Sequence, residues 1–130
     1  MKKNDDLKKR TKDFAIKIIR LYSSLPKSAE AQVIGKQFLR SGTSVGANYR
    51  EGCRARSQQE FIAKLGICLQ ELEETAYWLE LLIESGAIRN EVVNPTLKES
   101  NELIAIFVSS IKTCKKANKN SEFRSQNSEV

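Results

Sequence analysis

Five basic residues in the middle of the chain have the charge and the spacing to bind phosphate groups. We call them the basic stripe: Lys36, Arg40, Arg50, Arg54 and Arg56. At 100° per residue, the first four share one helix face over about 27 Å, opposite an apolar face, and no acidic residue lies among them. Since guanidinium groups make bidentate contacts with phosphates, the basic stripe predicts a nucleic-acid-binding site. The alternative is that it forms only the charged outer face that any soluble helix needs.

Side chains that could carry catalysis are scarce, because the sequence has no histidine. Hydrolases that activate a serine or cysteine through an imidazole are excluded, as are zinc sites that depend on one. A di-iron bundle fails for the same reason. Cys53, Cys68 and Cys114 lack a C-x-x-C spacing and are expected to be small core residues in a reducing compartment. An enzyme would have to use carboxylates, lysines or tyrosines alone, and a concave pocket that gathers Asn48, Glu51 and a lysine would indicate one. We expect no catalytic residue, no metal ion and no cofactor.

The net charge of +6 is unevenly distributed along the 130 residues. Residues 1–56 carry 14 Lys and Arg against 5 Asp and Glu, residues 57–105 carry 3 against 9, and residues 106–130 carry 5 against 2. The basic surplus favours a polyanionic partner, with nucleic acid first. The glutamates of the acidic part are expected to pair with basic helices of the same or a neighbouring subunit: Glu71, Glu73, Glu74, Glu80 and Glu84.

No segment of the sequence predicts membrane insertion or export. The longest uncharged stretches, residues 41–49 and 103–111, have about half of the roughly 20 residues that a membrane-spanning helix needs. No apolar run follows the first lysines, so we expect no signal peptide. These features predict a cytoplasmic protein.

Apolar residues recur with helical periodicity, which predicts an all-α fold. The expected helices span about residues 5–24, 29–55, 58–85 and 95–117, within one domain of residues 1–117. Ser57 and Glu60 form a capping box for the third helix, and Gly86 ends it. Four helices with short connections predict an antiparallel up-down four-helix bundle. Residues 118–130, rich in Asn, Ser and Lys, are expected to be a disordered polar tail.

The apolar faces of the first and third helices differ in width. The first helix has a single seam, formed by Leu7, Thr11, Phe14, Ile18, Leu21 and Leu25. The third helix carries a similar seam and, on another side, Ile67, Trp78 and Leu81. A helix in a small bundle usually needs one apolar stripe, so the surplus predicts a second partner for the third helix.

Three glycines in the second helix leave two conformations open. Gly42, Gly46 and Gly52 each disfavour a helix interior by roughly 1 kcal/mol relative to alanine. In one interpretation the helix is continuous and the glycines let a neighbouring helix approach closely. In the other, the chain kinks near residues 42–44 and exposes backbone N–H groups that could hold a phosphate.

A run of motif residues covers positions 44–74. It comprises Ser-Val-x-Ala-Asn-x-x-Glu-Gly at 44–52, then Arg54, Arg56-Ser57, Glu60-Phe61 and the Leu-Glu-rich segment 69–74. The run resembles four-helix-bundle proteins first noticed as open reading frames within intervening sequences of large-subunit ribosomal RNA genes. This resemblance implies a bacterial, non-enzymatic homopentamer. We expect a structural role for the motif residues Ser44, Asn48, Glu51 and Gly52.

The family resemblance also bears on partners and on the glycine segment. The fold superfamily includes accessory variability proteins of diversity-generating retroelements, which are basic pentamers that bind nucleic acid and a reverse transcriptase. The implied partners are further copies of the chain, nucleic acid, and a reverse transcriptase or ribosomal component. Family members usually have Pro where Gly46 stands, which favours the kinked conformation.

The leading hypothesis from the sequence is an oligomeric four-helix bundle that binds RNA or DNA through the basic stripe. The alternative is a scaffold without a nucleic-acid role, whose basic face docks an acidic partner protein. Copurifying nucleic acid distinguishes the two, because it raises the ratio of absorbance at 260 and 280 nm.

Overall fold

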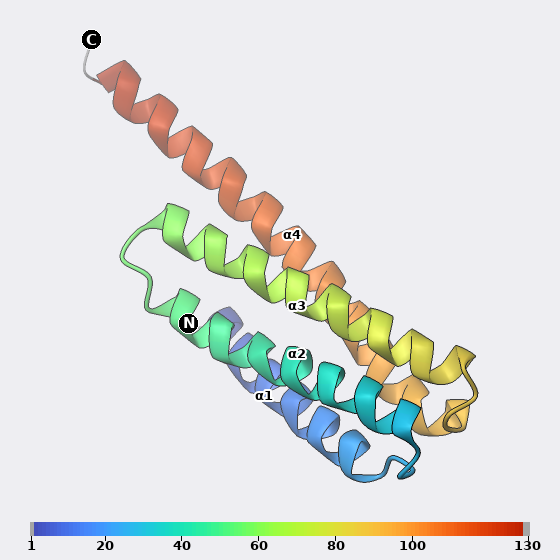
Figure 1. Ribbon diagram of the computed structural model, residues 1–130. Helices are drawn as coiled ribbons and strands as arrows, with labels where there is room; N and C mark the ends of the chain where they lie inside the picture. Colours follow the sequence, from blue (N-terminus) through green and yellow to red (C-terminus); the bar gives the residue numbers. More distant parts are fainter. Residues whose placement is uncertain (1, 129–130) are drawn as a thin grey trace.

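The protein is an all-α four-helix bundle in the computed structural model, which describes the backbone of residues 2–128 and the side chains of residues 6–121 and 124. The helices are α1 (Lys2–Ser23), α2 (Ala29–Cys53), α3 (Gln58–Glu84) and α4 (Asn90–Ser128). Each helix contacts its neighbours in the chain, and α1 also contacts α4, which closes the ring (Figure 1). The predicted antiparallel bundle is therefore confirmed.

Local sequence signals define the ends of α2 and α3. Ser28 caps α2 by accepting a hydrogen bond from the Ala31 N–H at 3.3 Å. The Ser57 hydroxyl accepts from the Glu60 N–H at 3.1 Å, while the Glu60 carboxylate accepts from the Arg56 N–H at 3.1 Å. Gly86 follows α3 with a φ of 73°, the left-handed conformation that glycine adopts most easily. The predicted capping box and glycine stop are confirmed.

The core contains the predicted α1 seam. Thr11, Phe14 and Ile18 are fully buried, and Leu21 and Leu25 are nearly so. They pack with buried side chains from the other three helices, including Phe38, Tyr49, Leu65, Leu72, Leu103 and Phe107. The rings of Tyr49 and Phe107 meet edge to face with centroids 5.7 Å apart. This contact places the last turns of α2 beside the middle of α4.

The glycines of α2 allow close helix contacts, as the first of the two interpretations predicts. The helix is continuous from Ala29 to Cys53, through the expected kink region. A Cβ atom on Gly42 would lie 2.6 Å from Ile18 Cγ1 of α1, and one on Gly46 would lie 3.2 Å from Thr11 Oγ1. A Cβ atom on Gly52 would lie 3.0 Å from Lys64 Cβ of α3. The glycines therefore bring α1 and α3 close to α2.

The course of α4 differs from the prediction at both ends. The helix begins at Asn90, so Pro95 lies in its second turn, where its missing N–H removes one backbone hydrogen bond. At the other end, residues 118–128 continue α4 where a disordered tail was predicted, and residues 129–130 lie outside the described part. No Gly or Pro follows Pro95, so nothing in the sequence interrupts the helical hydrogen bonds.

None of the helices in the described part of the chain is both long and apolar enough to cross a membrane.

Candidate nucleic-acid interface

All five residues of the basic stripe are exposed. Lys36, Arg40 and Arg50 lie on α2, whereas Arg54 and Arg56 lie in the connection to α3. The opposite face of α2 packs into the core through Phe38, Val45 and Tyr49. α2 is one continuous helix through residues 36–50, so its three stripe residues share one helix, as predicted. The helix ends at Cys53, before Arg54 and Arg56, so the stripe does not follow a single helix face to its end.

Arg40 differs from the rest of the stripe because it pairs with α3. Its guanidinium donates to Glu71 Oε2 at 3.3 Å and also contacts the Glu74 carboxylate. Glu74 in turn accepts from the Trp78 indole N–H at 3.0 Å. The prediction that acidic residues of the third helix pair with basic helices is confirmed for these two glutamates. Part of the positive charge of Arg40 is thus neutralised within the chain.

The other four residues of the stripe make no ion pair with any described side chain: Lys36, Arg50, Arg54 and Arg56. Two basic residues outside the stripe pair across helices. Arg10 of α1 donates to both carboxylate oxygens of Glu99 of α4, at 2.8 and 2.9 Å. Lys64 of α3 donates to Glu51 of α2 at 2.8 Å. The stripe therefore presents four cationic groups to solvent that the fold does not use.

The motif residues mostly contact their own helix or α3. The Ser44 hydroxyl donates to the Ser41 carbonyl at 2.8 Å, and the Asn48 amide donates to the Ser44 carbonyl at 2.9 Å. Glu51 joins α2 to α3 through Lys64, and Gly52 lies against the same lysine. These contacts give the motif residues a place in helix packing, beside the stripe rather than within it.

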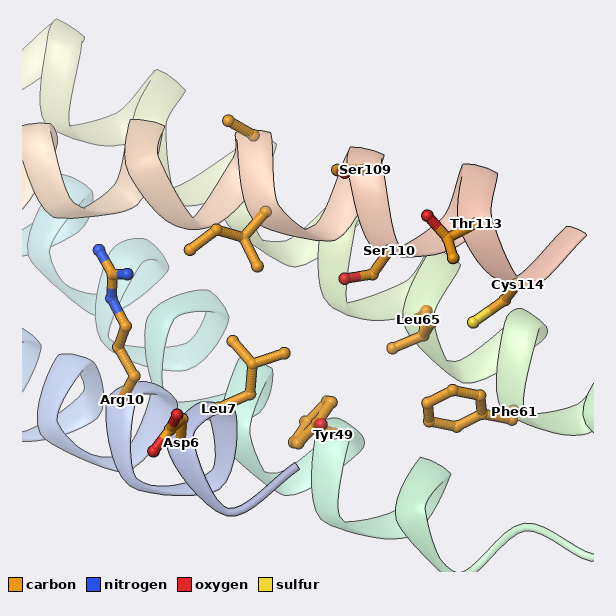
Figure 2. A pocket seen from close by; sticks show the side chains of 12 residues that line it. Asp6, Leu7, Arg10, Tyr49, Phe61, Leu65, Ser109, Ser110, Thr113 and Cys114 are labelled. Atoms are coloured by element: carbon orange, nitrogen blue, oxygen red, sulfur yellow. The ribbon is translucent and has the colours of Figure 1, made fainter. Parts of the chain in front are cut away.

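A groove of about 580 Å³ lies between α1 and α4 and reaches the ends of α2 and α3 (Figure 2). Leu7 and Tyr49 face Ser110, Thr113 and Cys114 across it. Neither Asn48 nor Glu51 lines this groove. An enzymatic site built on those two residues and a lysine would need such a pocket to gather them.

The groove and the core beside it hold two groups whose acidity is suppressed. Burial raises the pKa of the Tyr49 phenol above its usual value of 10.0, and a hydrogen bond with Cys53 raises it further. Burial also raises the pKa of the Cys68 thiol to about 12, while the thiol donates to the Val45 carbonyl at 3.5 Å. Both groups are therefore neutral at physiological pH, which disfavours their use as a base or a nucleophile.

The outer side of α3 carries the predicted surplus of apolar side chains. Ile67 is 36% exposed and Tyr77 is 53% exposed, whereas Trp78 and Leu81 are half-buried. These four residues, with Glu74 among them, fall on one side of α3, and we call them the α3 apolar face. Their burial within one chain is incomplete.

A protein-family model described as "23S rRNA-intervening sequence protein" matches residues 3–109. The chain belongs to this family. The match extends over all four helices, and the resemblance expected from the motif at residues 44–74 is confirmed.

A solved structure has a similar fold. It is a protein of unknown function from Bacteroides thetaiotaomicron, described as a member of the S23 ribosomal protein family. The two chains are 43% identical, and the alignment covers 85% of this chain and 98% of that chain with a TM-score of 0.78. No curated protein matches this chain.

Sequence reasoning located the stripe residues but could not assign their contacts. The structure brings Arg50, Arg54 and Arg56 to the end of α2, while Lys36 lies nearer its start. Arg40 was expected to bind phosphate, but in the structure it pairs with Glu71 and Glu74 of α3. Its pairing depends on how α2 and α3 align, which periodicity within one helix does not determine.

Proposed function

We propose that the protein binds structured RNA through the basic stripe on α2 and the connection to α3, acting by binding and not by catalysis. The observation that carries this proposal is the set of four exposed cations without an ion pair among the described side chains: Lys36, Arg50, Arg54 and Arg56. Cations that a fold does not use for its own packing are available to neutralise phosphates. Arg40 contributes less, because Glu71 and Glu74 already balance its charge.

RNA is favoured over DNA by the family to which the chain belongs, whose description refers to 23S rRNA intervening sequences. The chemistry of the stripe alone is shared by both nucleic acids, since lysine and arginine contact phosphates in either. We therefore expect binding to depend on the shape and charge of a duplex more than on its base sequence.

The proposal includes assembly into a homopentamer, as the family resemblance implies. The α3 apolar face supports association, because an exposed apolar face on a small bundle is usually covered by a partner. Several copies of a modest phosphate-binding face would then act together on one RNA and raise the apparent affinity.

The binding proposal is tested by fluorescence anisotropy with a labelled 24-base-pair RNA hairpin and the matching DNA duplex, in 50 to 200 mM salt. Removing two phosphate contacts with Arg50→Glu and Arg54→Glu should reduce the slope of log K against log salt by about 1.8, from 0.9 per contact. Across this fourfold salt range, the affinity difference between wild type and variant should then shrink about 12-fold.

The matched control is Lys27→Glu with Lys98→Glu, which makes the same change in charge at exposed positions outside the stripe. This control should bind RNA more tightly than the stripe variant at 50 mM salt. The proposal is contradicted if the stripe variant and the control variant have the same RNA affinity at every salt concentration. The basic stripe would then have no RNA affinity, which points to the alternative, an acidic protein partner.

Assembly is tested separately by light scattering coupled to size-exclusion chromatography. The wild type should have five times the chain mass of 14.7 kDa, and Ile67→Glu with Leu81→Glu should lower that mass. Ile16→Glu with Ile19→Glu alters partly exposed apolar residues of α1 and serves as the control. A wild type that elutes as a monomer refutes the assembly proposal and leaves the binding proposal intact.

A further inference from the structure

The last part of α4 leaves the bundle as a single helix. At 39 residues, α4 is longer than α3, which has 27, and it extends beyond the start of α3 (Figure 1). The Ser100 hydroxyl donates to the Leu72 carbonyl, which aligns the two antiparallel helices. Counting from this contact, the first residue of α3 lies opposite residue 114 of α4. We call residues 112–128, which begin in the last turn beside α3, the α4 arm.

The α4 arm carries a regular row of cations on its outer side. Lys112, Lys115, Lys116 and Lys119 are exposed and follow the i, i+3, i+4, i+7 spacing, which places them within roughly 100° on one helix face. The opposite side begins at Cys114, which lines the groove against α1. Like charges one turn apart disfavour a helix, so the row has no evident role in stabilising the arm.

These lysines also make no ion pair with any described side chain. On α1, by contrast, Lys9 donates to Asp13 one turn away at 2.8 Å. Between 112 and 121, the described side chains of the arm include no large apolar residue. Protein interfaces usually centre on buried aromatic or aliphatic anchors. A polyanion fits the lysine row better than a protein surface does.

The fold concentrates positive charge at the end from which the arm leaves. Contacts between Thr11 and Gly46 and between Val45 and Cys68 mark the middle of the bundle. On the arm side of that level, described residues in 6–12, 46–68 and 104–124 include 13 Lys and Arg against 3 Asp and Glu. On the other side, residues 13–45 and 69–103 include 7 against 10. We call the first half the basic end.

The arm is an addition to the part of the chain that defines the family. The family model matches residues 3–109, and 98% of the solved relative aligns with 85% of this chain. The shared bundle ends close to the point where the lysine row begins. A role of the arm would therefore distinguish this chain from relatives that have the bundle alone.

We propose that the α4 arm is a second RNA-contacting element, which lays its lysine row along the phosphate backbone of a duplex. The inference rests on the proposed RNA binding by the basic stripe, whose Arg50, Arg54 and Arg56 lie at the same end of the bundle. Lysines contact phosphates as point charges, so the arm adds affinity without base specificity. A duplex that spans both elements is held at two places.

The test uses the full chain and the labelled 24-base-pair RNA hairpin described above. Lys115→Ala with Lys116→Ala removes two cations and introduces alanine, the residue with the highest helix propensity, so circular dichroism should show an intact helix. The slope of log K against log salt should fall by about 1.8, and the affinity difference from wild type should shrink about 12-fold between 50 and 200 mM salt. Lys27→Ala with Lys98→Ala is the matched control.

The outcomes separate the arm from the stripe. If the arm variant matches its control while Arg50→Glu with Arg54→Glu still weakens binding, the arm inference fails and the proposed function stands. The reverse result retains the arm and removes the stripe. If neither variant weakens RNA binding relative to its control, both proposals are refuted. If poly-L-glutamate displaces the hairpin as effectively, per charge, as unlabelled RNA does, the arm recognises acidic chains in general and the assignment to RNA is overturned.

Discussion

Replacing Gly42 by alanine tests the close contact between α1 and α2. The new Cβ would lie 2.6, 2.8 and 3.0 Å from three atoms of the Ile18 side chain, which is fully buried and cannot move aside easily. Overpacking of this kind lowers the free energy of unfolding by about 1–3 kcal/mol, and the higher helix propensity of alanine offsets about 1 kcal/mol of that. We therefore expect Gly42→Ala to destabilise the bundle by up to about 2 kcal/mol.

Gly66 of α3 provides the matched comparison. It also lies inside a helix, but no neighbouring atom lies within 4 Å of the position where a Cβ would be. Gly66→Ala should therefore gain only the helix propensity and stabilise the bundle by up to about 1 kcal/mol. The two alanine variants should differ by about 1–3 kcal/mol, although the chemical change is the same.

The assay is urea unfolding followed by circular dichroism at 222 nm, at one protein concentration. A third variant, Ile18→Ala, removes all three atoms that the new methyl group would meet. Its destabilising effect should be about 1–3 kcal/mol smaller in the Gly42→Ala background than in the wild type, because it relieves the overpacking. Equal stability of the Gly42→Ala and Gly66→Ala variants would refute the inferred contact.

Three further predictions concern the α3 cap, the Arg10–Glu99 ion pair and the buried Cys68 thiol. Ser57→Ala removes the N-cap of α3 and should lower the free energy of unfolding by about 1 kcal/mol in the same urea assay. The hydrogen bond from Arg10 lowers the pKa of Glu99 below its usual 4.5, so this pair stabilises the fold fully above pH 4.5 and less as the pH falls through the folded-state value. Glu99→Gln should therefore reduce the loss of stability between pH 5 and pH 3. Burial raises the pKa of Cys68 to about 12, so this thiol should react with Ellman's reagent at pH 8 only as the protein unfolds.

Each of these predictions has a simple contradiction. Ser109→Ala, at an exposed position within α4, is the control for the cap and should leave the stability unchanged within about 0.5 kcal/mol. An acid limb of the stability curve that is identical in wild type and Glu99→Gln contradicts the ion-pair argument. Modification of Cys68 in the folded protein at the rate of a free thiol contradicts its burial.

Features that depend on neighbouring residues in the chain could be predicted from the sequence. The capping box of Ser57 and Glu60 and the stop at Gly86 are such features, since the atoms involved lie within four residues. The α1 seam was also predictable, because burial of Phe14 and Ile18 follows from their spacing. These signals suffice to predict a helical bundle, because each helix forms from local signals and packs by burying its one apolar face.

Features that depend on alignment between helices could not be predicted. Arg40 meets Glu71 and Glu74 only because α2 and α3 pack at one particular offset, which small residues such as Gly52 help to set. The extent of α4 was missed for another reason. Its last residues have few apolar side chains, which is typical of disorder, but they also lack any residue that stops a helix.

The unequal charge of the two ends of the bundle gives the molecule a large electric dipole along its long axis. Near a polyanion, such a dipole turns the molecule before contact, so that the basic end leads and the acidic end is repelled. Encounters then begin in a nearly productive orientation, which raises the association rate constant more than it lowers the dissociation rate. Salt should therefore slow the arrival of the protein on a polyanion, while a complex already formed is less affected.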